Sequence, residues 1–231
     1  MILARLSAAL LPPGGQRPIG TVVCTALVLS SVALGASPEP DAAAVVARLQ
    51  EWLDATTELE GRFEQTLASG ALGTGLEESG RFYLHRPGRM RWDYHEPERK
   101  VALIEDQATR LYLEEDAQLW EGRLEDGGLL AALLAGSGPV SAAFEADLLA
   151  GPQESGAGSY RLRLVPRTEA DSFRHVTLTL HEPEFAIREA EVLDGTGNRM
   201  LYRFSGLRRN RGLPEGIFRF VPPPGTEVLR P

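Results

Sequence analysis

Histidine and serine are the residues of this chain whose types could support metal binding or nucleophilic catalysis. The four histidines are His85, His95, His175 and His181. No two of them have the i, i+4 spacing with which a helix presents two zinc ligands, and no neighbouring cysteine could complete a site. Ser137 lies between two glycines, but its neighbours do not complete the nucleophile elbow of a serine hydrolase. These residues therefore predict neither an enzyme nor a metal site.

Short glycine and carboxylate motifs are no more specific. The two Gly-Thr-Gly runs, at 73–75 and 195–197, do not open a helix after a strand, as a dinucleotide-binding loop must. The acidic pairs Glu77-Glu78 and Glu114-Glu115 fall in turns or at strand ends. We interpret all four as ordinary turn and surface features, so the sequence predicts no cofactor.

The charge balance limits the possible partners. The chain has 24 Lys and Arg residues against 32 Asp and Glu residues, a formal net charge of −8, and Lys100 is its only lysine. Nucleic-acid binding depends on a basic patch that neutralises phosphates, and no such patch stands out in the sequence. An acidic chain of this kind predicts no nucleic-acid partner.

Residues 1–36 have the composition of an export signal. Arg17 precedes a mostly apolar run, Ile19–Gly35, which ends in small residues. We expect cleavage near Gly35–Ser37, which would leave residues 37–231 as the mature domain. The alternative is an uncleaved anchor, but a run of roughly 17 residues is short for spanning a bilayer. Cys24, the only cysteine, lies within this segment and lacks the small preceding residues of a lipobox.

The rest of the chain alternates apolar and polar residues in about ten short runs, a pattern typical of antiparallel strands. Two stretches, near 41–56 and 128–135, instead show the apolar stripe of a helix. Residues 141–149 stay open between helix and irregular structure. An antiparallel sheet must cover its apolar face, and two helices are little cover for so many strands. The predicted fold is mainly β (α+β), with a curved sheet around a hydrophobic cavity; a fully packed core is the alternative.

The stretch Arg81–Tyr94 predicts a β-hairpin with one aromatic face. Apolar residues alternate with polar ones on both sides of Arg86-Pro87-Gly88-Arg89. Proline and then glycine at the centre of this run indicate a tight turn. Two further motifs are Phe63-x-Gln65 in an early strand and Phe218–Gly225 near the end of the chain, where we expect a strand over Phe218–Val221 that prolines terminate.

These three motifs, in this order, resemble the outer-membrane lipoprotein carrier protein (LolA) family. The Arg86-Pro87 step and Trp92 match the family's hairpin, whereas Met90 occupies a position where an aromatic residue is common, and Gln107-Ala108 replaces a usual Asp-Gly turn. The resemblance implies an incomplete antiparallel β-barrel covered by a few helices. It covers most of residues 41–228.

The resemblance also implies a function. The family's proteins are monomeric periplasmic chaperones without enzymatic activity that hold the acyl chains of lipoproteins. They receive cargo from an inner-membrane lipoprotein-releasing ABC transporter and deliver it to an outer-membrane acceptor, here either LolB-like or of another kind. Two alternatives stay open: an envelope sensor or interaction module with a related fold, and a carrier of a non-proteinaceous lipid.

The candidate site follows from the motifs and the resemblance. We expect the lipid cavity to be lined by a wall of Phe63, Phe82, Leu84, Met90 and Trp92, together with Leu129, Leu130, Leu133 and Leu134 under the lid. The resemblance places a latch at Arg86, whose guanidinium would hydrogen-bond backbone carbonyls of the lid. The alternative for Arg86 is a surface arginine that pairs with Glu96 or Glu98.

The export signal makes a direct prediction. N-terminal sequencing of the protein from its native host should find Ala36 or Ser37 as the first residue, because the small residues that signal peptidases need end there. Recovery of the intact leader in washed membranes would instead identify an anchor and contradict a soluble carrier.

Overall fold

The computed structural model describes residues 40–68, 75–123, 129–136, 138–155, 158–168, 173–214 and 216–230. All of them belong to one compact unit, Pro38–Pro231. The predicted export signal and the loop at 69–74 lie outside the described residues.

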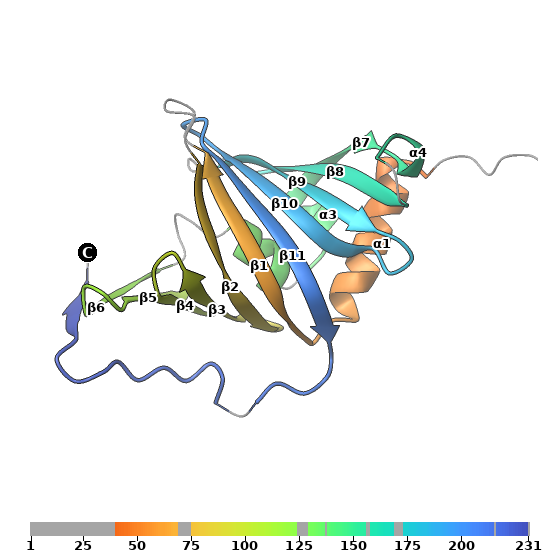
Figure 1. The fold of residues 1–231 in the computed structure, drawn as a ribbon. Helices are drawn as coiled ribbons and strands as arrows, with labels where there is room; N and C mark the ends of the chain where they lie inside the picture. The colour runs from red at the N-terminus through yellow and green to blue at the C-terminus, as the bar shows by residue number, and fades with distance from the viewer. Residues whose placement is uncertain are drawn as a thin grey trace, which may run out of the picture. The chain divides into compact units, whose positions relative to one another are not determined.

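A single sheet of twelve strands organises this unit, and its order is β12-β6-β5-β4-β3-β2-β1-β11-β10-β9-β8-β7 (Figure 1). Neighbouring strands are antiparallel except for the pair β12 and β6. The strands are β1 Glu58–Ala68, β2 Gly75–His85, β3 Arg89–Glu96, β4 Lys100–Glu105, β5 Ala108–Leu113, β6 Gln118–Arg123, β7 Phe144–Ala150, β8 Ser159–Pro166, β9 Phe173–His181, β10 Ala186–Asp194, β11 Arg199–Arg209 and β12 Glu227–Leu229. Because β12 and β7 end the order, the barrel is not closed, as predicted.

The helices are α1 Ala42–Asp54, α2 Leu129–Ala135, α3 Val140–Ala143 and α4 Pro152–Ser155. Asp41 begins α1, because its side chain accepts a hydrogen bond of 2.8 Å from the backbone N–H of Ala44. The predicted stripe of α1 is buried: Val45, Val46, Leu49, Trp52 and Leu53. This helix packs against β7 and β8, and α2 packs against β2, β3, β9 and β10.

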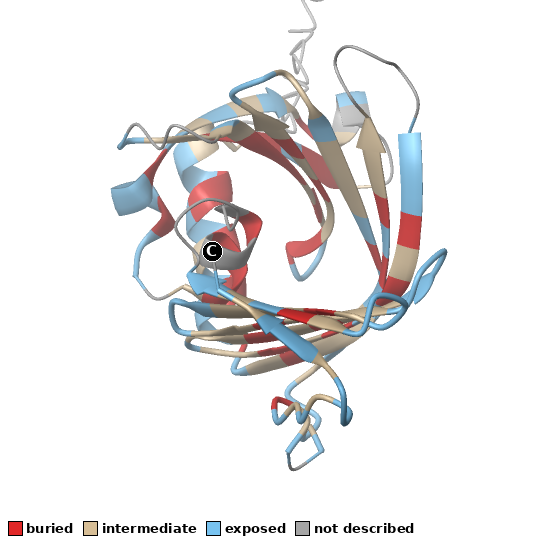
Figure 2. Ribbon diagram, turned by 90° about the vertical axis from the view of Figure 1, so that its left-hand side faces the viewer, coloured by how far each residue is buried: buried red, intermediate tan, exposed pale blue. Residues whose placement is uncertain are grey.

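The sheet curves around these helices, and Figure 2 shows buried residues recurring along its strands. Period-2 alternation explains this arrangement, since alternate residues of each strand point to opposite faces. Gly80 is required on the concave face, because a Cβ at this position would lie 2.0 Å from the carbonyl oxygen of Asp93 and 2.9 Å from the Phe63 ring. The missing side chain makes room for the aromatic cluster.

Two expectations about local structure need correction. Phe218–Val221 is not a strand: it belongs to the segment that leaves β11 and passes β2 and β3 before β12 pairs with β6 (Figure 1). Residues 141–149 are neither a longer helix nor irregular, because a one-turn helix, α3, leads directly into β7. The conformation of both segments depends on packing against residues distant in the sequence. The alternation of apolar and polar residues within a short window does not reveal such contacts.

Gly80→Ala tests the packing of the concave face. The added Cβ must displace the backbone of β3 or the Phe63 ring, so we expect the free energy of unfolding to fall by about 1–3 kcal/mol, the usual cost of overpacking. Urea denaturation measures this loss.

Gly122→Ala is the matched control, because its new Cβ would meet only the Thr109 hydroxyl at 3.4 Å. It should change stability little or raise it slightly by restricting the unfolded chain. Equal losses in the two variants would contradict the proposed packing constraint.

Candidate functional site

Five candidate wall residues from three strands meet on the concave face. Phe63, Phe82, Leu84, Met90 and Trp92 are each at most 7% exposed and belong to one cluster. The Phe63 ring meets the Trp92 ring edge-on at a centroid distance of 4.7 Å, an orientation favoured by the ring quadrupoles. The centroids of the Phe82 and Phe204 rings lie 5.2 Å apart. Phe204 belongs to β11, and the sequence analysis did not predict it as a wall residue. The five side chains thus form one apolar surface, which their mutual packing and the helices shield from solvent.

Helix α2 supplies the residues expected beneath the lid. Leu130, Leu133 and Leu134 are buried in the same cluster as the wall. Leu129 begins α2, but its side chain lies outside the described part of the structure. This seven-residue helix packs against β2 and β3, the strands that carry four of the five wall residues.

The β2–β3 turn holds the C-terminal end of α2 at two points. Gly88 adopts a φ of +82°, and its backbone N–H donates to the carbonyl of Ala135 at 2.8 Å. Arg86 Nη2 donates to the carbonyl of Gly136 at 2.7 Å. These carbonyls belong to the last turn of α2 and its cap, where a helix leaves acceptors without internal partners. The alternative partners of Arg86, Glu96 and Glu98, lie at the other end of β3.

The guanidinium of Arg86 is held in a costly environment. Burial lowers its pKa from the ordinary arginine value, and the negative charge of Asp54 opposes this shift. Its Nη1 atom is buried and has no hydrogen-bond partner among the described residues. A buried donor without an acceptor costs free energy, so this hydrogen-bonded contact is only partly stabilising.

Gln50 forms a third tie to the same region, which sequence reasoning missed. Its Oε1 accepts from the backbone N–H of Val140 at 2.8 Å, while its Nε2 donates to Asp54 at 2.7 Å. Gln50 thus connects α1 to the start of α3, just beyond α2. Its position on the polar side of α1 gave no signal, because the contact joins residues ninety positions apart.

A polar cluster lies on the same face toward the other end of β2 and β3. Glu78 of β2 forms an ion pair with Lys100 of β4, and Lys100 Nζ lies 4.3 Å from the centre of the Tyr94 ring. The Tyr94 hydroxyl donates to Gln65 Oε1 at 3.1 Å. Burial, followed by nearby charge, raises the pKa values of Tyr94 and Tyr202, so both phenols stay protonated at neutral pH. The sequence analysis placed Glu78 in a turn or at a strand end and did not predict this cluster.

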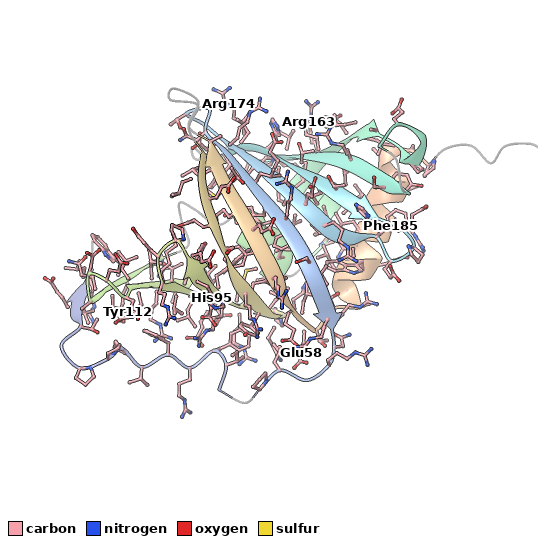
Figure 3. The ribbon with its side chains drawn as sticks, in the orientation of Figure 1. Glu58, His95, Tyr112, Arg163, Arg174 and Phe185 are labelled. Atoms are coloured by element: carbon pink, nitrogen blue, oxygen red, sulfur yellow. The ribbon has the colours of Figure 1, made fainter. Side chains whose placement is uncertain are left out.

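The outer face of β3–β6 carries a second, smaller apolar cluster. Leu103, Tyr112, Leu119 and Phe218 are buried but lie outside the main core. The C-terminal segment, near which Figure 3 labels Tyr112, covers them. The centroids of the Tyr112 and Phe220 rings lie 5.2 Å apart, and Cζ of Arg89 lies 5.2 Å from the centroid of the Phe218 ring. Arg91 also donates to the carbonyl of Ile217 at 2.7 Å. The Phe-x-Phe motif therefore covers the outer face and does not line the candidate site.

Among the described residues, no group of three or more histidine, cysteine or acidic residues is arranged to hold a metal ion. None of the helices that the structure describes has the length and apolar character needed to cross a membrane.

Comparison with known proteins is consistent with the fold and with the motifs. Residues 54–221 match the family model described as outer membrane lipoprotein carrier protein LolA. The outer-membrane lipoprotein carrier protein of Alkalilimnicola ehrlichii is 33% identical over 87% of this chain and 92% of its own length. The corresponding protein of Methylococcus capsulatus is 31% identical over 79% of this chain and 86% of its own.

A solved structure shares the fold at low sequence identity. An uncharacterized conserved protein from Thermus thermophilus has a TM-score of 0.50 and 15% identity, and the match covers 81% of this chain and 97% of that one. The identity of the curated relatives and the extent of the family match decide the classification. This chain belongs to the outer-membrane lipoprotein carrier protein LolA family.

Proposed function

We propose that this protein is a periplasmic chaperone without enzymatic activity that carries the acyl chains of lipoproteins between the two membranes. Membership of the LolA family supports this function, and so do relatives named as lipoprotein carriers. The observation that carries the proposal is the apolar concave face under a short helix that the Arg86 turn holds at its end. An inner-membrane releasing transporter and an outer-membrane acceptor are the partners this role requires.

The physical task explains why a covered apolar face is needed. Each CH₂ group exposed to water costs about 0.8 kcal/mol, so one 16-carbon chain would cost on the order of 12 kcal/mol. The wall residues are at most 7% exposed, because α2 and their own rings cover them. Acyl chains can reach this surface only when α2 moves away, so α2 acts as the lid.

The short length of α2 suits such a movement. A helix of seven residues has little stability of its own, because nucleation is unfavourable and few hydrogen bonds follow it. Its position depends on the leucines that pack on the wall and on the ties from Gly88, Arg86 and Gln50. Acyl chains can replace the leucine contacts, but they cannot replace the hydrogen bonds. The ties therefore bias the empty protein toward the closed form.

Ligand binding tests the proposed cavity. The dye bis-ANS should bind the folded protein and be displaced by a triacylated lipopeptide, because both need the apolar surface under α2. Fluorescence titration measures the binding and the displacement.

Mass spectrometry of material that co-purifies from the periplasm should identify acylated proteins. Free lipids alone would indicate a lipid carrier, and a non-acylated protein partner would indicate a sensor. A folded protein without displaceable dye binding would support a packed core.

Arg86→Leu tests the latch. The substitution removes a charge-assisted hydrogen bond worth about 1–3 kcal/mol, which shifts the balance between closed and open forms by roughly 5- to 150-fold. Cargo binds the open form, and closing of the protein helps to expel it. A protein whose closed form is less stable therefore holds its cargo more tightly. We expect the variant to accept lipoprotein but to transfer it poorly, as measured by release to the acceptor.

Arg89→Leu is the matched control from the same turn. Arg89 lies over Phe218 on the outer face, so its loss should leave transfer close to that of the wild type even if stability falls slightly. Equal transfer defects in both variants, or none in either, would make Arg86 an ordinary structural arginine.

A further inference from the structure

The concave face carries three successive rows of side chains across β11, β1 and β2. The strand register places Phe204, Phe63 and Gly80 in an aromatic row. The next row toward the β1–β2 loop holds three polar residues, Tyr202, Gln65 and Glu78, and the last holds three aliphatic ones, Met200, Leu67 and Leu76. The register aligns Tyr94 of β3 and Lys100 of β4 with Gly80, but their side chains reach the polar row through the Tyr94–Gln65 hydrogen bond and the Lys100–Glu78 ion pair. A polar row thus separates two apolar surfaces.

We propose that this polar row, with Lys100 at its β4 end, binds the ester and amide carbonyl groups that join the acyl chains to the lipoprotein. The inference rests on the proposed carrier function, which it extends by assigning a place to the polar end of the cargo. An acyl ester has the same order of polarity as the three rows: a methylene chain, a carbonyl group, and then the glyceryl carbons.

The donors of the row suit a neutral acceptor. An ammonium group has three N–H donors, and the hydrogen bond to Glu78 uses one of them. The Lys100 side chain is 20% exposed, so Glu78 and Tyr94 do not enclose it completely. Carbonyl oxygens accept hydrogen bonds without adding charge. A phosphate would bring a negative charge close to Glu78, which is itself only 9% exposed.

A purely structural role explains the row poorly. Replacing a buried ion pair by apolar residues is often neutral or stabilising, so stability alone gives little reason to keep one on an apolar face. If the polar row only marked the edge of the core, the residues beyond it on the same face would be expected to be polar. Instead Leu76, beyond the ion pair, is 51% exposed. Apolar surface open to solvent on the far side of a polar row is what a ligand with a polar middle would cover.

The test uses two lipopeptides that differ only in the carbonyl groups. One carries dipalmitoylglyceryl-cysteine, and the other carries the same chains as hexadecyl ethers, which lack the ester carbonyls. Displacement of bis-ANS gives both affinities. The wild type should bind the ester about tenfold more tightly, as expected for a hydrogen bond from a charged donor. Lys100→Met should lose this preference while its affinity for the ether stays unchanged.

Two controls separate the site from its surroundings. Arg163→Met removes a cation from an exposed ion pair on β8 (Figure 3) and should keep the ester preference. Because Lys100→Met leaves Glu78 without its cation, the double variant with Glu78→Gln removes both charges. It should show the same loss of preference with thermal stability close to that of the wild type.

Chemical modification tests the ester preference in the folded wild-type protein, so the result does not depend on whether a variant folds. Lys100 is the only lysine, so acetylation of the folded protein neutralises this side chain and no other amine except the N-terminus. Acetylation should abolish the ester preference of the wild type. Lys100→Arg keeps the charge and cannot be acetylated on its side chain, so the same treatment should leave its preference intact.

The outcomes distinguish this inference from the carrier function. Binding of both lipopeptides without an ester preference, or with a preference that survives loss of Lys100, would overturn the role of the polar row and leave the carrier function standing. Failure of the wild type to bind either lipopeptide would overturn the carrier function itself. If phosphatidylglycerol depends on Lys100 and the ester lipopeptide does not, the row binds phosphate, and the proposal is wrong.

Discussion

The need to cover the concave apolar face is the constraint on which the rest of this structure depends. Twelve strands present more apolar surface than four short helices can bury independently, so the sheet curls and its aromatic residues pack on one another. Phe63 and Trp92 meet edge-on because Gly80 leaves room beside them. Part of the cover of this core is a helix of seven residues, which has little stability of its own. In the proposed function, this helix is the part of the cover that moves most easily.

The β2–β3 turn fixes the end of this helix. Gly88 and Arg86 donate hydrogen bonds to consecutive carbonyls at the end of α2, so a single turn holds the helix by backbone and side chain together. The guanidinium is also partly desolvated and leaves Nη1 without a partner among the described residues. This cost offsets part of the gain from the hydrogen bond. A contact of this kind can bias an equilibrium without fixing it, which a carrier that must also release its cargo requires.

Local pattern predicted the elements that local physics determines. The hairpin at Arg81–Tyr94, the α1 stripe and the antiparallel class all follow from periodicity and turn residues, and the structure confirms them. The site residues came from the motifs, and their functional roles stay predictions. Gln50 and the Glu78–Lys100 pair were missed because each joins strands or helices that only the completed sheet brings together. The prediction of a strand over Phe218–Val221 was wrong for the same reason. The rings of Phe218 and Phe220 pack against Arg89 and Tyr112, which are distant in the sequence.

The C-terminal segment covers apolar residues on the outer face of the sheet. The β4–β6 part of the sheet carries apolar residues on both faces, and Leu103 and Tyr112 on the outer one would meet water if the chain ended at β11. A strand over Phe218–Val221 would pair at an edge and could not cover that face. The extended segment lays Phe218 and Phe220 over it and then protects the β6 edge with β12. On the inner face Trp120 stays 41% exposed, so the segment leaves open the side that faces the proposed cargo.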